Sequence, residues 1–70
     1  MITLKEIQLR LSEKIKASGL TQTEIANRLG VKQPTVGQYI SGRAMPALDT
    51  FANLCIILNV EPAEILGTNV

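Results

Sequence analysis

Amide and hydroxyl side chains gather in one short segment near the middle of this chain. Gln33, Thr35 and Gln38 lie within six residues of one another, between Gly30 and Gly42. A glutamine amide can bond N6 and N7 of an adenine together, and a threonine methyl group can meet the methyl group of a thymine. The segment therefore has the chemistry needed to read the edges of base pairs in duplex DNA.

Groups suited to catalysis are scarce in the same sequence. It has no histidine, its six acidic residues are scattered, and its single cysteine, Cys55, lies among apolar residues. No cluster has the spacing of metal ligands, and no glycine-rich loop is suited to holding a phosphate. We therefore expect no enzymatic activity, no metal or other cofactor, and no small-molecule ligand.

Length and composition point to one small domain. The chain has 70 residues, 46% of them hydrophobic but only 3% aromatic, which predicts an aliphatic core. The longest apolar run covers five residues, 54–58, which is too short to span a bilayer, and the N-terminus lacks the pattern of a signal peptide. A single cysteine, which cannot form an internal disulfide, is consistent with a reducing compartment. These features predict a cytoplasmic protein without a membrane partner.

Positive charge is concentrated in the part of the chain that holds the polar segment. Residues 25–48 carry Arg28, Lys32 and Arg43 and no acidic residue, whereas residues 49–70 carry three acidic residues and no basic one. The middle of the chain should therefore repel a polyanion least. Double-stranded DNA is the partner that charge and side-chain chemistry favour together, although three charges are equally consistent with a solvated surface.

Five helices are predicted to position these groups. Thr3 to Glu6 and Thr21 to Glu24 each match a capping box, and a glycine or asparagine after each apolar stripe indicates a helix end. Pro34 suits the first turn of the third helix. The predicted helices lie between Thr3 and Ser18, between Thr21 and Gly30, and over residues 33–41, 47–58 and 62–66.

Apolar residues spaced three and four apart predict which helix faces are buried. If Val36 and Ile40 face the core, then Thr35, Gly37 and Gln38 point largely outward. Gly37 costs about 1 kcal/mol relative to alanine in a helix, so this outer face is poorly suited to helix stability alone. The expected core faces are Leu4, Ile7, Leu11 and Ile15; Ile25, Ala26 and Leu29; Val36 and Ile40; and Leu48, Phe51, Leu54, Cys55 and Leu58.

The second and third predicted helices are joined by only about three residues, 30–32, which is the layout of a helix-turn-helix. The stretch from Leu20 to Gly42 resembles the helix-turn-helix of phage repressor and Cro proteins, and the likeness extends from Leu4 to Leu66. The resemblance implies an all-α fold: a compact five-helix, lambda repressor-like DNA-binding domain over residues 1–66, with a C-terminal tail over residues 67–70. The matching positions are Gln22, Ala26, Gly30, Val31, Gln33, Val36 and Gly42.

The resemblance also implies roles for individual residues. Gln22 matches a residue that contacts a phosphate, and Gln33 matches the first base-reading residue, although it can instead cap its own helix. The tyrosine at position 39 flanks the core stripe, so packing competes with a phosphate contact there. Pro34 and Lys32 depart from the family pattern. The predicted DNA contacts are Thr21, Gln22, Lys32, Gln33, Thr35, Gln38, Tyr39, Ser41 and Arg43.

Apolar residues near the C-terminus indicate a second surface. Ile56 and Ile57 lie off the core face of the fourth helix, and with Val60 and Ile65 they suggest a self-complementary patch, hence a homodimer.

From the helix-turn-helix and the expected dimer together, we expect a transcriptional regulator, a repressor, that reads an inverted-repeat operator. The alternative is a protein-interaction module on the same fold, such as an antitoxin that neutralises a toxin and represses its own operon. The sequence leaves open the operator, the target genes and whether the chain belongs to a longer repressor.

Overall fold

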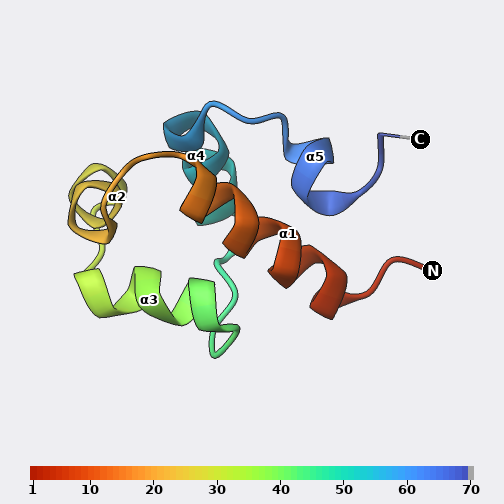
Figure 1. The fold of residues 1–70 in the computed structure, drawn as a ribbon, viewed down its shortest axis with the longest axis horizontal. Helices are drawn as coiled ribbons and strands as arrows, with labels where there is room; N and C mark the ends of the chain where they lie inside the picture. The colour runs from red at the N-terminus through yellow and green to blue at the C-terminus, as the bar shows by residue number, and fades with distance from the viewer. Residues whose placement is uncertain (70) are drawn as a thin grey trace.

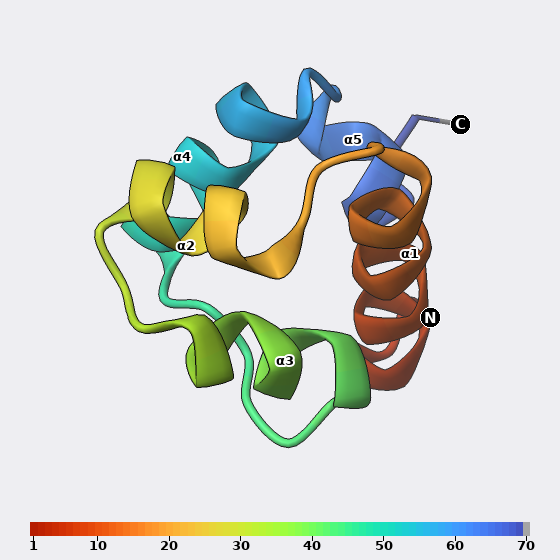
Figure 2. The ribbon, with the colours of Figure 1, turned by 60° about the vertical axis from the view of Figure 1, so that its left-hand side comes forward.

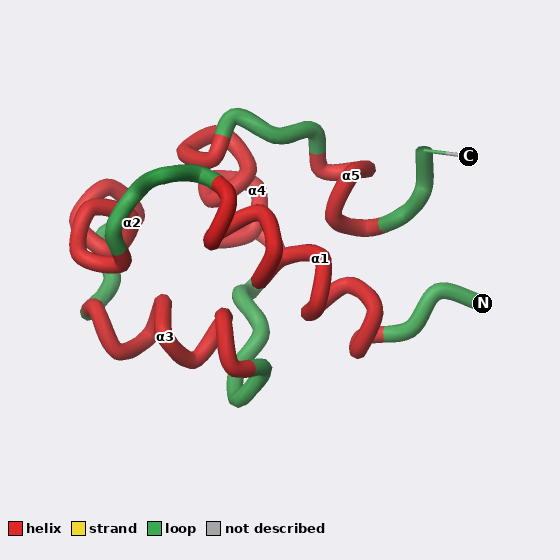
Figure 3. Tube along the Cα trace, in the orientation of Figure 1, coloured by secondary structure: helices red, strands yellow, loops and turns green. Residues whose placement is uncertain are grey.

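The computed structural model describes residues 1–69, and over these residues it contains helices and loops but no strand (Figures 1 and 3). The five-helix, all-α fold predicted from the sequence is confirmed. Part of the predicted tail, Val70, lies outside the described residues. The helices are α1 (Leu4–Ala17), α2 (Gln22–Leu29), α3 (Gln33–Ser41), α4 (Leu48–Leu58) and α5 (Pro62–Leu66).

Local capping explains why the first helices begin where they do. The Thr21 hydroxyl accepts from the Glu24 N–H at 3.1 Å, while the Thr21 N–H donates to the Glu24 carboxylate at 3.3 Å, so this capping box is complete. At the start of α1 only half of the predicted box forms. The Thr3 hydroxyl accepts from the Glu6 N–H at 3.2 Å, but the Glu6 carboxylate binds that hydroxyl instead of the Thr3 N–H.

Each helix packs against at least one other around the core. α1 packs against α3 and α5, and α2 packs against α3 and α4. In Figure 2, α3 lies along one edge of the molecule, while α4 and α5 lie on the opposite side. α3 therefore contacts the core along one face and leaves its other face uncovered.

The core is aliphatic, as the composition predicted. Leu11, Ile25, Val36, Leu54 and Ile65 are its largest fully buried side chains, and together they come from all five helices. Cys55 is buried beside them on α4. Burial raises the pKa of the Cys55 thiol, so the group remains protonated at neutral pH and packs as a small apolar residue.

Two leucines predicted for the core are exposed. Leu4 is 69% exposed and Leu48 is 87% exposed. Each is the first residue of its helix, and because side chains lean toward the helix N-terminus, these two project past the helix end. The spacing of apolar residues predicted which face of each helix is buried. It did not show how far along each helix the neighbouring helices extend, so it could not show that the first residue of α1 and of α4 is left uncovered.

Two further predictions about burial are corrected. On α3 the second core residue is Tyr39, which is 6% exposed, whereas Ile40 is only half-buried at the edge of the core. Ile65, predicted for a surface patch, is 0% exposed. α5 lies against α1 and turns this residue inward, so Ile65 stabilises the fold and is not available to a partner.

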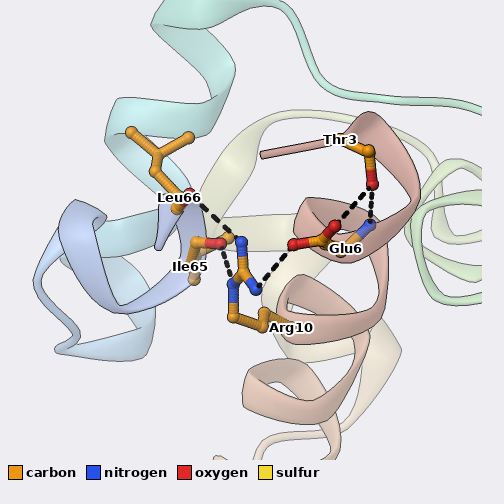
Figure 4. A network of polar contacts seen from close by, with 5 residues as sticks. All are labelled: Thr3, Glu6, Arg10, Ile65 and Leu66. Atoms are coloured by element: carbon orange, nitrogen blue, oxygen red, sulfur yellow. Dashed lines mark hydrogen bonds and ion pairs between the residues drawn. The ribbon is translucent and has the colours of Figure 1, made fainter. Parts of the chain in front are cut away.

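Arg10 holds α5 against α1 (Figure 4). Its guanidinium donates to the carbonyl oxygen of Ile65 at 2.6 Å and to that of Leu66 at 3.1 Å, and it lies 4.0 Å from the Glu6 carboxylate. These carbonyls stand at the end of α5, where a helix cannot satisfy them itself. Arg10 therefore caps α5 from a helix more than 50 residues away in sequence.

Candidate DNA interface

α3 presents its polar residues on the side away from the core. Val36 and Tyr39 are buried, whereas Lys32, Gln33 and Gln38 are exposed. The predicted contact Thr35 is half-buried. The structure thus exposes Gln33 and Gln38 on α3, and this helix lies along one edge of the molecule (Figure 2).

Gln22 lies over this face from the neighbouring helix. A Cβ atom placed on Gly37 would be 3.4 Å from the side-chain oxygen of Gln22, which shows how closely that side chain approaches the backbone of α3. Gly37 follows Gln33 by one helical turn. Gly37, a poor helix former, therefore lies where the start of α2 meets the predicted base-reading surface, and it leaves room for the Gln22 side chain.

The hydroxyl groups predicted to contact phosphate already have partners. The Thr21 hydroxyl donates to the Glu24 carboxylate at 3.1 Å and caps α2, and the Ser41 hydroxyl donates to the Gln38 carbonyl at 3.3 Å. At the start of α2, however, the first backbone N–H groups point along the helix axis and are suited to a phosphate oxygen. In the free domain the Thr21 side chain is therefore occupied in capping α2.

Tyr39, a predicted phosphate contact, is largely buried. The residue is 6% exposed and belongs to the core cluster, so most of its surface is unavailable. The prediction treated Tyr39 as a residue beside the core stripe, whereas α3 is rotated enough to bury it next to Val36. Its main role is to anchor the helix.

Three exposed basic residues lie in or next to the helix-turn-helix. Arg28, Lys32 and Arg43 are all exposed, and within residues 1–69 no carboxylate lies within ion-pair distance of any of them. The ion pairs of the described chain instead join Arg10 with Glu6, and Lys14 with Glu64. Within the described chain these three side chains therefore carry positive charge that no ion pair neutralises, which suits attraction of a polyanion.

One residue near this surface was missed by sequence reasoning. Gln8 on α1 donates its side-chain amide to the Ile40 carbonyl at 3.0 Å and approaches the Tyr39 carbonyl at 3.4 Å. In sequence, Gln8 follows the core residue Ile7 and resembles any solvated polar residue. Only the packing of α1 against α3 reveals its contact.

A groove of about 550 Å³ lies on the other side of the molecule, where α4 ends and α5 begins. Ile56 and Val60, both predicted for a dimer contact, line it; Ile56 is 76% exposed, and Val60 is half-buried, as is the nearby Ile57.

No three histidine, cysteine, aspartate or glutamate side chains within residues 1–69 are grouped so that they could hold a metal ion. Across the same residues, no helix has the length and apolar character needed to cross a membrane.

Comparison with known proteins agrees with this geometry. Residues 11–65 match the sequence model of a family described as helix-turn-helix. The chain is 37% identical over 41 residues to the HTH-type transcriptional regulators for three conjugative elements: R391 of Providencia rettgeri, SXT of Vibrio cholerae and pMERPH of Shewanella putrefaciens. The match covers 59% of this chain but 19% of each regulator, so the matched segment corresponds to about a fifth of their length. No solved structure matches the chain significantly.

Proposed function

This chain belongs to the helix-turn-helix family of DNA-binding transcriptional regulators, of the phage repressor and Cro type, and we propose that it is a repressor that places α3 in the major groove of an inverted-repeat operator. The observation that carries the proposal is the outer face of α3, where Gln33 and Gln38 are exposed on a helix held to the core by Val36 and Tyr39. Exposed glutamines on a rigid helix suit base recognition.

The proposed contacts divide into base readers and phosphate contacts. Gln33, Thr35 and Gln38 would meet base edges in the groove. Gln22 and the N-terminal N–H groups of α2 would bind a phosphate, and Lys32 and the basic residue at position 43 would add charge on either side. The phosphate contacts would set the register of the helix on the duplex, and the amides would supply discrimination between sequences.

A homodimer would match the symmetry of such an operator. Ile56 is 76% exposed near the C-terminal end of α4, and with the half-buried Ile57 and Val60 it offers a small patch for a second copy. Two copies would then read half-sites about 34 Å apart. We further propose that residues 1–66 form the DNA-binding domain, that residues 67–70 form a tail, and that the protein acts in the cytoplasm without catalysing a reaction.

Titration of labelled duplex DNA of mixed sequence, first at low salt and then at about 200 mM, tests DNA binding directly. Phosphate contacts release counterions, so affinity should be measurable at low salt and should fall steeply at high salt. An absence of binding at both concentrations would refute the proposal.

Two single variants separate the proposed base readers from the phosphate contacts. Gln33→Ala should reduce the discrimination between operator and mixed-sequence duplex by about 1–3 kcal/mol and leave mixed-sequence affinity nearly unchanged. Lys32→Gln, at the preceding residue, should weaken binding to both duplexes equally and lower the salt slope by about 1. Equal losses on both duplexes for Gln33→Ala would show that Gln33 reads no base.

A further inference from the structure

The C-terminal end of α3 has carbonyl groups that its own backbone leaves without partners. The N–H groups of Gly42, Arg43 and Ala44 all turn back to one acceptor, the Gln38 carbonyl, the last two at 3.0 and 3.3 Å. In a continuing helix, the donors at positions 43 and 44 would bind the carbonyls of Tyr39 and Ile40. The turn at the end of α3 therefore leaves these two carbonyls in need of another donor.

Gln8 supplies that donor from α1. Its amide nitrogen lies 3.0 Å from the Ile40 carbonyl oxygen and 3.4 Å from that of Tyr39. Figure 2 shows the end of α3 beside α1, and these two helices pack directly against each other. The contact joins residues more than 30 positions apart, so it fixes α3 relative to another part of the fold.

Gly42 makes room for this contact. A Cβ atom at Gly42 would lie 3.0 Å from the Gln8 Cδ atom and 3.2 Å from its Oε1 atom, closer than side chains normally pack. The residue also has a φ of 83°, which favours glycine. Gly42 therefore serves two purposes: it ends α3, and it lets the amide of Gln8 lie against the final turn.

We propose that Gln8 is a positioning residue for base recognition, because it holds the last turn of α3 in a single orientation. The inference rests on the proposed function of α3. Val36 and Tyr39 anchor the buried side of the helix, while Gln8 fixes the end that follows the proposed base reader Gln38. Without Gln8 the last turn would sample several orientations, and only the competent fraction would bind an operator tightly. Mixed-sequence binding depends on phosphate contacts and tolerates this variation.

The test uses Gln8→Met, which keeps the length of the side chain and removes its donors. At a temperature well below unfolding, the ratio of operator affinity to mixed-sequence affinity should fall by between about two- and tenfold, a range set by the net free energy of such hydrogen bonds. The matched control is Leu9→Met, which places the same side chain at the next, exposed position of α1 and should leave the ratio unchanged. A change confined to stability would lower the active fraction on both duplexes equally and would also leave this ratio unchanged.

A second measurement requires no DNA. Amide hydrogen exchange at Arg43 and Ala44, whose N–H groups close the last turn, should be at least about threefold faster in Gln8→Met, while exchange at the core residue Leu54 should not change. Unchanged exchange at the two turn residues would overturn the proposal, as would an operator ratio equal to that of the unsubstituted protein. If the unsubstituted protein prefers no duplex sequence at all, the proposed function itself fails, and this result is visible before any variant is made.

Discussion

Replacing Gly37 by alanine should stabilise the free domain and weaken its binding to an operator. Gly37 is the only glycine inside a helix of the described chain, and it lies beneath the side chain of Gln22. Glycine is about 1 kcal/mol less favourable than alanine in a helix interior. The residue therefore lowers the stability of α3 at the place where close approach of DNA is proposed.

The structure sets the size of both effects. The new methyl group would lie 3.4 Å from the Gln22 side-chain oxygen, an ordinary contact with the end of a flexible side chain, so most of the gain in helix propensity should remain. We expect Gly37→Ala to raise the free energy of unfolding by about 0.5–1 kcal/mol, which for a domain of this size raises Tm by about 2–8 °C. The same methyl group would fill the surface between Gln22 and Gln33, which should cost about 1 kcal/mol, or roughly fivefold, in operator affinity.

Thermal unfolding followed by circular dichroism and titration with operator and mixed-sequence duplexes measure the two effects. Asn27→Ala is the matched control, because it removes a poor helix former from the exposed side of α2. It should raise stability without changing the operator affinity. A lower Tm for Gly37→Ala would show that the contact with Gln22 leaves no room for the methyl group, and an unchanged operator affinity would show that DNA does not approach this part of α3.

Three further predictions concern the other side of the molecule. Arg10→Met removes the donors that cap α5 and should lower the free energy of unfolding in urea by about 1–3 kcal/mol; a loss below about 0.5 kcal/mol would mean that α5 does not need the cap. Ile56→Glu should shift the proposed dimer toward monomer in sedimentation, and an unchanged distribution would place the interface elsewhere. The pKa of Glu64 lies below its ordinary value of 4.5, chiefly because the carboxylate accepts from the Glu61 N–H and secondarily because Lys14 lies beside it. As pH falls, the unfolded state binds a proton at this carboxylate before the folded state does, so the stability contributed by Glu64 should be lost from about pH 4.5 down through the lower folded-state pKa. Glu64→Gln, which lacks this carboxylate, should therefore show a shallower decline of Tm in acid. Parallel curves of Tm against pH for the two proteins would contradict this.

The helices and the helix-turn-helix were predictable because their signals are local. The capping box from Thr21 to Glu24 and the left-handed glycines at positions 30 and 42 lie within a few residues of the helix ends that they define. The outward face of α3 was predicted from Val36 and Ile40, and although Ile40 is only half-buried, Gln33 and Gln38 are exposed as expected. Sequence reasoning succeeds here because each inference spans only a turn or two.

The errors and omissions involve contacts between distant parts of the chain. Whether Ile65 faces inward depends on how a five-residue helix docks on α1, and its own periodicity is too short to decide this. The amide of Gln8 and the guanidinium of Arg10 reach carbonyls at the ends of α3 and α5, which become neighbours only after folding. Polar side chains that cap a distant helix have no local pattern, so residues of this kind require the structure.

The central claim, that α3 reads base pairs as part of a symmetric pair, is tested most directly by selecting bound sequences from a random pool of duplex DNA. We expect enrichment of an inverted repeat whose half-sites are centred about 10 base pairs, or 34 Å, apart. In the same selection, Gln33→Ala should relax the preference at the base pair that Gln33 contacts in each half-site. Recovery of a pool with no enriched sequence would contradict the claim.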